Sequence, residues 1–143
     1  MTPEARSPAG SLRTGVAQAV LSEIALLLEN LAATGQAGAI DLRSLPLTEA
    51  DRAELEEHLG RGEVEARLAV VGASEVWETA YAGVWWIRHL GAEGEIASET
   101  IAVTRVPEIL MTHPADVEAA AARLQELIML RRESAIGEET GNG

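Results

Sequence analysis

Hydrophobic and polar positions change their spacing along this 143-residue chain. Apolar side chains recur at helical spacing in TGVAQAVLSEIALLLENLAATG, which predicts a long helix that ends at Gly35. The same spacing predicts a short helix in LTEADRAELEEHLG, with Thr48 as its N-cap, and a second long helix in THPADVEAAAARLQELIMLRR. Between these two helices, from Gly62 to Val106, apolar and polar residues alternate, which is typical of strands.

Turn residues divide this alternating region at Gly72-Ala73, at Ala82-Gly83 and from Gly91 to Gly94, and GAIDLRSLPL predicts a further short strand. The pattern therefore predicts an α+β fold. We expect an antiparallel meander sheet of about four to five strands, with two long helices packed on one face and a short helix. The expected organisation is a disordered N-terminus over 1–13, a single domain over 14–131 and a disordered acidic tail over 132–143.

Four aromatic residues, three Trp and one Tyr, all lie between Trp77 and Trp86. Two-residue turns would place Leu68 opposite Trp77, and Tyr81 on the same apolar face as both Trp77 and Trp86. We expect this face to form the core beneath the helices. Arg88 and Glu99 interrupt it, which predicts an ion pair. The residues expected on this face are Val64, Ala66, Leu68, Val70, Trp77, Tyr81, Val84, Trp86, Leu90, Ile101 and Val103.

Trp85 falls on the opposite, more polar face, beside Val76 and Ile87. An apolar patch left in water on a sheet commonly marks a contact surface, so the pattern favours partner binding there. The alternative is that a loop, a terminus or a second copy covers the patch. A deeply buried Trp85 would contradict the partner-binding hypothesis. The predicted partner-binding residues are Val76, Trp85 and Ile87, with a polar rim of Arg67, Glu78 and His89.

Charge narrows the classes of partner. The chain carries 23 acidic and 11 basic side chains, a net charge of −12. Nucleic acid and anionic membrane surfaces are therefore disfavoured as partners. The first residues contain no apolar segment of a signal peptide, and no uninterrupted apolar run is long enough to span a membrane. We expect a cytoplasmic protein.

Motifs for catalysis and metal binding do not stand out in the sequence. There is no Cys, and His58, His89 and His113 match no metal-binding spacing. Neither a phosphate-binding loop nor a nucleophile elbow occurs. We expect no enzyme activity, no metal and no cofactor. Two alternatives remain: a small-ligand or metal site assembled in three dimensions, and a homo-oligomeric interaction module.

Four segments in order, IDLRSLPL, GEVEARL, SEVWETAYAGVWWIRH and IAVTRVPEIL, resemble the hydrogenase expression/formation proteins of the HupH/HyaF family. The resemblance covers roughly residues 38–111. Trp86 departs from it, since a smaller or aliphatic residue is expected there, and family members are often longer than this chain.

The resemblance implies a cytoplasmic accessory chaperone for assembly of uptake [NiFe] hydrogenase. It implies that the partners are a hydrogenase subunit precursor, with the Fe–S small subunit favoured before export, and other maturation factors. It carries over no catalytic residues.

Overall fold

The computed structural model describes residues 12–69 and 72–141. Contacts divide the chain after Pro107 into two compact units, each of which is described by itself. The first unit contains α1 (Val16–Thr34), β1 (Gly38–Asp41), α2 (Glu49–Leu59), β2 (Glu65–Leu68), β3 (Ala73–Glu78), β4 (Val84–Leu90) and β5 (Ile96–Val103). The second contains a 3-10 turn at Glu108–Leu110 and α3 (Pro114–Gly141).

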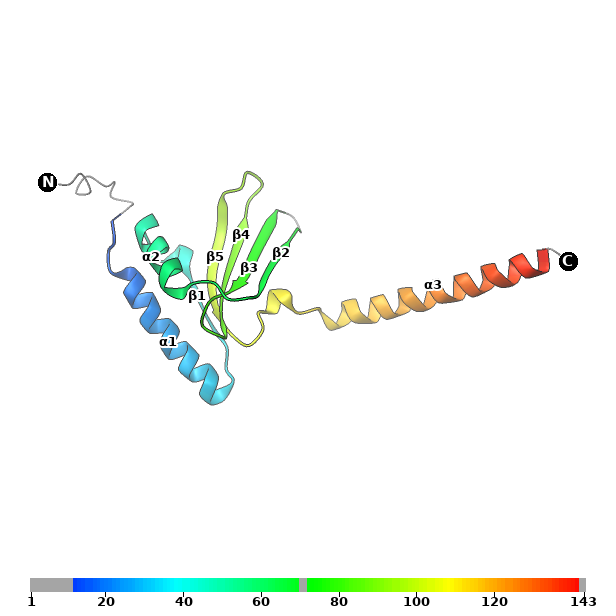
Figure 1. Cartoon of the computed structure of the whole chain (residues 1–143), viewed down its shortest axis with the longest axis horizontal. Coiled ribbons are helices and arrows are strands. Elements are labelled where there is room, and N and C mark those ends of the chain that lie inside the picture. Colours follow the sequence, from blue (N-terminus) through cyan, green and yellow to red (C-terminus); the bar gives the residue numbers. More distant parts are fainter. Residues whose placement is uncertain (1–11, 70–71, 142–143) are drawn as a thin grey trace. The chain divides into compact units, whose positions relative to one another are not determined.

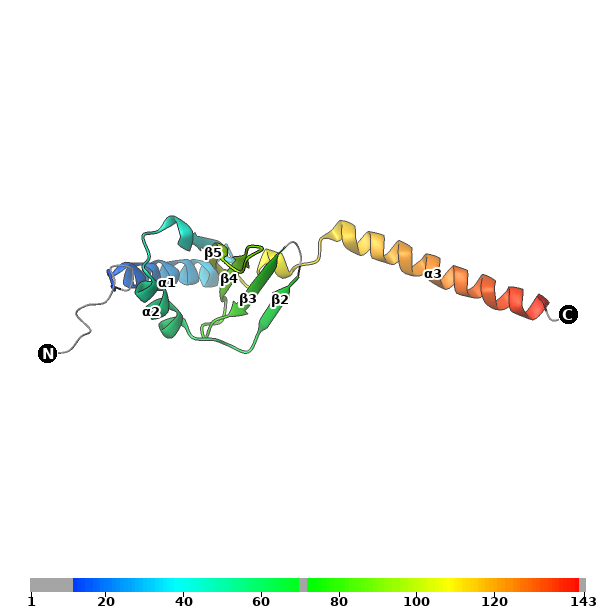
Figure 2. The same ribbon diagram turned by 90° about the horizontal axis from the view of Figure 1, so that it is seen from above.

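The strands described in the first unit form one antiparallel five-stranded sheet in the order β1-β5-β4-β3-β2. Strands β2 to β5 are consecutive neighbours, and β1 adds to the outer edge of β5. Figure 1 shows α1 and α2 beside the sheet, and Figure 2 shows the same two helices from above. The predicted α+β class and meander are confirmed.

Local sequence signals set the ends of the first two helices. Gly35 ends α1 in the left-handed conformation, and its N–H donates to the Leu31 carbonyl. At the start of α2, the Thr48 side chain accepts from the Asp51 N–H, and the Asp51 side chain accepts from the Thr48 N–H. This reciprocal capping box satisfies N–H groups that a helix start otherwise leaves without partners. Both ends agree with the sequence pattern.

The core lies between the sheet and the two helices of the first unit. Trp77 pairs with Trp86, and Trp86 pairs with Ile101, so their side chains share one face. From the helix side, α1 contributes Ala17, Val20 and Ile24 and α2 contributes Leu55 and Leu59; all are buried. The core position predicted for Tyr81 is wrong. Strand β3 ends at Glu78, and Tyr81 lies in a turn with 53% of its surface exposed.

The pairing of β2 with β3 differs from the prediction. Glu65, not Leu68, lies opposite Trp77. This offset is an odd number of residues, so every side chain of β2 changes face. In the two later hairpins the predicted register is wrong by two residues, which leaves each side chain on its predicted face. Val70, which was predicted to belong to the core face, lies outside the described residues.

The predicted single domain over 14–131 and the predicted tail over 132–143 stay predictions. Contacts divide the chain after Pro107 into two compact units. Helix α3 continues to Gly141, well into the predicted disordered tail. The reason is that Glu, Ala and Arg, which are good helix formers, occupy most of this segment before Gly141. The predicted packing of this helix on the sheet stays a prediction, and most of the predicted disordered N-terminus lies outside the described residues.

Among the described helices, α1 alone is long and apolar enough to cross a membrane by length and composition. Its mean hydropathy is 1.5. A single such helix is weak support for a membrane span, because the core helix of a soluble protein satisfies the same criterion. Here the buried side of α1 belongs to the core.

Candidate functional site

The predicted partner-binding residues do not all share one face. Val76 pairs with Ile87, and Glu78 pairs with Trp85; because His89 is two residues from Ile87, it lies on the same face. Arg67 lies opposite Glu75 and so faces the helices instead. The odd offset in the pairing of β2 with β3 places Arg67 on that face. The same offset brings Ala66 directly opposite Val76 and thus adds an apolar neighbour to this face.

The exposure predicted for the centre of this patch is wrong. Val76 is 0% exposed and Trp85 is 5% exposed, comparable with 2% for Trp77. The chain after β5 supplies a partner for the indole, because Trp85 Nε1 donates to the Thr104 carbonyl oxygen over 3.1 Å. Trp85 and Val76 are therefore core residues. A partner was expected at Val76 and Trp85 because both were predicted to be exposed, and neither of them is.

The margin of the same face is only partly exposed. Ile87 and His89 are half-buried, and the His89 Nδ1 lies 2.6 Å from the Ser74 hydroxyl. Glu78 is also half-buried, and its carboxylate accepts from the Gly83 N–H over 3.3 Å. These three residues keep some surface for a contact, and their role in partner binding stays a prediction.

On the face beneath the helices, the predicted ion pair of Arg88 with Glu99 is confirmed. Arg88 Nε donates to Glu99 Oε2 over 2.9 Å, and Arg52 Nε from α2 donates to Oε1 over 2.9 Å. Trp86 Nε1 also donates to Oε2, over 2.8 Å. The Glu99 side chain is fully buried, and a buried carboxylate needs this set of donors. Because Arg52 belongs to α2 and Glu99 to β5, this cluster fixes α2 to the sheet.

The tryptophan stack completes this cluster. The rings of Trp77 and Trp86 are stacked at 5.6 Å with 9° between their planes. The guanidinium of Arg61 lies 4.0 Å from the centre of the Trp77 ring, and that of Arg88 lies 5.1 Å from it. A cation–π contact contributes little at the half-exposed Arg61 and more at the largely buried Arg88. The ring of Trp86 thus has a structural role.

Asp51 holds the segment before α1 against α2. Its carboxylate accepts from the Thr14 N–H over 2.7 Å and from the Thr14 hydroxyl over 2.6 Å, in addition to its capping-box contact with Thr48. Burial raises the pKa of Asp51, but these hydrogen bonds outweigh it and lower the pKa from 3.8 to about 2. Asp51 is therefore a charged structural residue at neutral pH.

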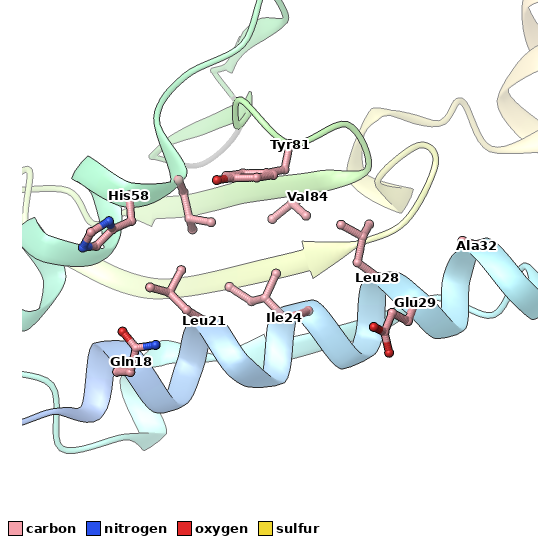
Figure 3. Close-up of a pocket in the computed structure, with 11 residues that line it drawn as sticks. Gln18, Leu21, Ile24, Leu28, Glu29, Ala32, His58, Tyr81 and Val84 are labelled. Carbon is pink, nitrogen blue, oxygen red and sulfur yellow. The ribbon is translucent and has the colours of Figure 1, made fainter.

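An open apolar groove lies between α1, the end of α2 and the turn that carries Tyr81. Its volume is about 680 Å³, within the range typical of ligand-binding clefts. Figure 3 shows Tyr81 and His58 on the opposite side of the groove from α1. The lining residues are Gln18, Leu21, Ile24, Ala25, Leu28, Glu29, Ala32, His58, Leu59, Tyr81 and Val84.

The Tyr81 turn is fixed by hydrogen bonds rather than by strand pairing. The Tyr81 N–H donates to the Thr79 hydroxyl, which in turn donates to the Tyr81 carbonyl, both over 3.2 Å. The Val84 N–H donates to the same carbonyl over 3.0 Å. Thr79 is buried, so the turn has a fixed base. The aromatic ring predicted for the core therefore forms part of the groove wall.

The side of α1 that lines the groove overlaps with its core side, because Ile24 belongs to the core and Leu21 and Leu28 pack against it. The core side presents Ala17, Val20, Ile24, Leu27 and Leu31, which are buried or partly buried. One residue further along the chain, a second set repeats the same spacing of three and four: Gln18, Leu21, Ala25, Leu28 and Ala32. We call this second set the groove seam. Its spacing is visible in the sequence, but it was not predicted to form a separate surface.

The three histidines are not assembled into a metal site. His58 lies 3.9 Å from Glu54, His89 contacts Ser74, and His113 accepts from the Ala115 N–H. No group of three or more His, Cys, Asp or Glu side chains suited to a metal occurs in the described part of the chain. The alternative of a metal-binding protein thus gains no support from the described residues.

Comparison with known families gives one match over most of the chain. The family model described as HupH hydrogenase expression protein, C-terminal conserved region, matches residues 15–130. That range includes both α1 and most of α3. The match is therefore to the whole described fold and not to a single motif.

Individual relatives support the same family. The chain is 33% identical over 94 residues to the hydrogenase expression/formation protein HupH of Rhodobacter capsulatus, which covers 66% of this chain and 34% of that protein. It is 29% identical over 89 residues to the hydrogenase expression/formation protein HoxQ of Azotobacter vinelandii, covering 62% and 31%. The chain thus spans about a third of the length of the curated relatives it matches.

A solved structure shows the same fold. The hydrogenase expression protein HupH from Thiobacillus denitrificans ATCC 25259 is 45% identical, with a TM-score of 0.79. The similarity covers 82% of this chain and 98% of that one.

Proposed function

Because this chain belongs to the HupH hydrogenase expression protein family, we propose that it is a non-catalytic accessory factor in hydrogenase maturation. The proposed client is the Fe–S small subunit of an uptake [NiFe] hydrogenase, held as a precursor in the cytoplasm before export. Other maturation factors would join the same assembly. The relatives' names support the maturation role, and the choice of client is the finer part of the proposal.

The observation that carries a binding role is the open apolar groove on the first unit. A groove of about 680 Å³ that combines apolar side chains with a few polar groups is suited to hold part of another molecule. The described polar clusters, by contrast, are satisfied internally: Glu99 by two arginines and an indole, and Asp51 by two threonines. Binding, not reaction, is therefore what the geometry supports.

The absence of Cys from the sequence also shapes the proposal. Thiolate ligands for an Fe–S cluster would have to come from the client. The contribution of this chain would then be to hold the client polypeptide while its clusters are inserted or awaited. Contacts from the half-buried Glu78, Ile87 and His89 could add to the groove on a large client.

A small apolar ligand is a second candidate, favoured by the volume of the same groove. A self-associating module is a third. Each candidate predicts a different companion of the purified protein. A small-ligand protein would carry an extractable small molecule, a self-associating module would carry a second copy, and a maturation factor would carry a hydrogenase subunit.

The test is affinity purification of the tagged full chain from its native host, grown under conditions that induce hydrogenase. Recovery of the small-subunit precursor, identified by mass spectrometry with its export segment intact, supports the proposal. Recovery of a different hydrogenase subunit would retain the maturation role and replace the client. A preparation from induced cells that contains no hydrogenase component or maturation factor would contradict the proposed function.

A further inference from the structure

We propose that the groove seam of α1 and the facing wall of His58 and Tyr81 form a docking site for one cationic amphipathic helix of a partner protein. The inference rests on the proposed function only for the identity of that partner, which would be the hydrogenase precursor. The class of ligand is argued from the groove itself.

The spacing of the groove seam indicates that the occupant is a helix. Residues at alternating intervals of three and four form the contact line between helices that cross at a small angle. The core side of α1 uses this spacing against the sheet and α2. The groove seam repeats it: Leu21 and Leu28 are half-buried against the core, and Gln18, Ala25 and Ala32 are exposed. Leu21 and Leu28 alternate with the small Ala25 and Ala32, which leave room between them for a partner's side chains.

The length of the seam also suits a helix. From Gln18 to Ala32 the axis of α1 rises by about 21 Å, at roughly 1.5 Å per residue. A helix that uses apolar anchors at i, i+3 or i+4 and i+7 needs only about 10 Å for those anchors. The floor is already formed, because Ile24, Leu59 and Val84 are buried by the core. The site therefore requires little rearrangement of the backbone.

Charge sets the type of helix. Helix α1 carries Glu23 and Glu29 and no basic residue, and Glu29 lines the groove beside the seam. Of α2, only His58 and Leu59 line the groove, so Glu29 is the one acidic side chain among the lining residues. Glu54 and Glu56 of α2 are paired with Arg13 and Arg88, and the chain as a whole has a net charge of −12. The surroundings of the groove thus attract Lys and Arg on the flanks of a partner helix and repel an acidic one.

The experiment measures binding of synthetic peptides of roughly 15 residues, enough for four helical turns. The probe has a Leu/Ala seam and Lys/Arg flanks. One control peptide has the same composition in a shuffled order without the seam, and another has Glu in place of Lys/Arg. Each is titrated into the full-length protein by isothermal titration calorimetry, and the amide signals of Ala25 and Leu28 are followed by NMR.

Ala25→Arg is the blocking variant, because Ala25 is exposed and a long cation at the centre of the seam opposes both packing and charge. Ala33→Arg is its matched control: the same substitution, on the same helix, at an exposed residue outside the groove. Circular dichroism and thermal unfolding confirm that each variant is folded. We expect the probe to bind at least about tenfold more weakly to Ala25→Arg, and within about twofold of the parent to Ala33→Arg.

Equal binding of the seam peptide and the shuffled peptide would overturn the proposal, since only general charge attraction would then remain. Equal binding to the parent and Ala25→Arg would also overturn it. If no peptide binds and light scattering shows that Ala25→Arg converts a dimer to a monomer, a second copy is the occupant and the proposal is wrong.

The proposed function is tested separately by purifying Ala25→Arg from induced host cells. Retention of the precursor by a variant that no longer binds the peptide would keep the maturation role and move the client to another surface. Peptide binding by a parent protein that never recovers a hydrogenase component would keep the helix site and contradict the proposed function.

Discussion

The two faces of the sheet bury tryptophan in different ways. On the face beneath α1 and α2, Trp77 and Trp86 stack within a cluster that holds a fully buried carboxylate, Glu99. On the opposite face, Trp85 is nearly as buried, but its indole N–H meets only the neutral carbonyl of Thr104. Trp85 and Trp86 are adjacent in β4, yet the Trp86 indole donates to a buried charged group and the Trp85 indole donates to a neutral one.

The difference shows what burial of a charge requires. Glu99 is buried where Arg52, Arg88 and Trp86 each supply an N–H group, so its desolvation is offset by three hydrogen bonds. No side-chain polar atom buried in the described residues lacks a partner. On the opposite face, a single carbonyl satisfies the Trp85 indole, and the carboxylate of Glu78, which is only half-buried, accepts from the Gly83 N–H. Three substitutions probe this contrast, given in order from the largest expected effect to the smallest, and a change of pH follows them.

Replacing Trp86 by Ala should have the largest effect. The change leaves a cavity, removes the stack on Trp77 and withdraws one donor from Glu99. We expect the free energy of unfolding to fall by about 5 kcal/mol, the upper part of the range for buried aromatic truncations. Urea unfolding followed by circular dichroism measures it. A loss below about 2 kcal/mol would mean that the stack is not a principal part of the core.

Glu99→Gln should cause the next largest loss of stability. The amide keeps the shape of the side chain but leaves two arginines facing each other without their shared carboxylate. We expect a loss of about 3 kcal/mol, since both arginines keep partial contact with water and regain some hydration. The control is Glu57→Gln on the exposed side of α2, which should stay within about 0.5 kcal/mol of the parent. Equal effects of the two substitutions would show that the cluster adds no stability.

Trp85→Phe should have a smaller effect. The new ring retains most of the apolar contact but cannot donate to Thr104. A loss of about 1–2 kcal/mol is expected from the missing hydrogen bond and the reduced volume. Binding of the hydrogenase precursor should be unchanged, because Trp85 is core. A folded variant of parental stability that binds the precursor at least about tenfold more weakly would restore Trp85 as an interface residue.

Acid should act at Asp51, a carboxylate outside the Glu99 cluster. Since its pKa in the folded chain is lowered from 3.8 to about 2, its stabilising contribution is complete above pH 3.8 and is lost as the pH falls toward 2. Asp51→Asn should remove this part of the acid dependence and leave the rest. Unfolding curves between pH 2 and pH 5 test this over the interval around those two pKa values. Identical slopes for parent and variant would contradict the role of Asp51.

Local signals were enough to predict several elements. The helix ending at Gly35 and the capping box of Thr48 with Asp51 depend on residues within one turn, so the sequence predicts them directly. The faces of β3, β4 and β5 were also correct, although each predicted pairing was off by two residues, because side-chain alternation has a period of two. The pairing of Arg88 with Glu99 followed from those faces.

The candidate site could not be predicted in the same way. A two-residue turn was expected at Ala82-Gly83, but hydrogen bonds of the Thr79 hydroxyl end β3 early and place Tyr81 in the groove wall. The odd offset of β2 exchanged Arg67 for Ala66 beside Val76. The early end of β3 and the register of β2 both depend on contacts between segments. The alternation of apolar and polar residues within a single strand does not predict such contacts.

The sequence by itself therefore determined which segments of the first unit are helix and strand, where α1 ends and where α2 begins. Only the tertiary structure decided that part of α1 lines a groove, that Trp85 is covered and that Tyr81 is exposed. The physical reason is that periodicity fixes the direction of a side chain relative to its own backbone, whereas burial depends on what lies opposite.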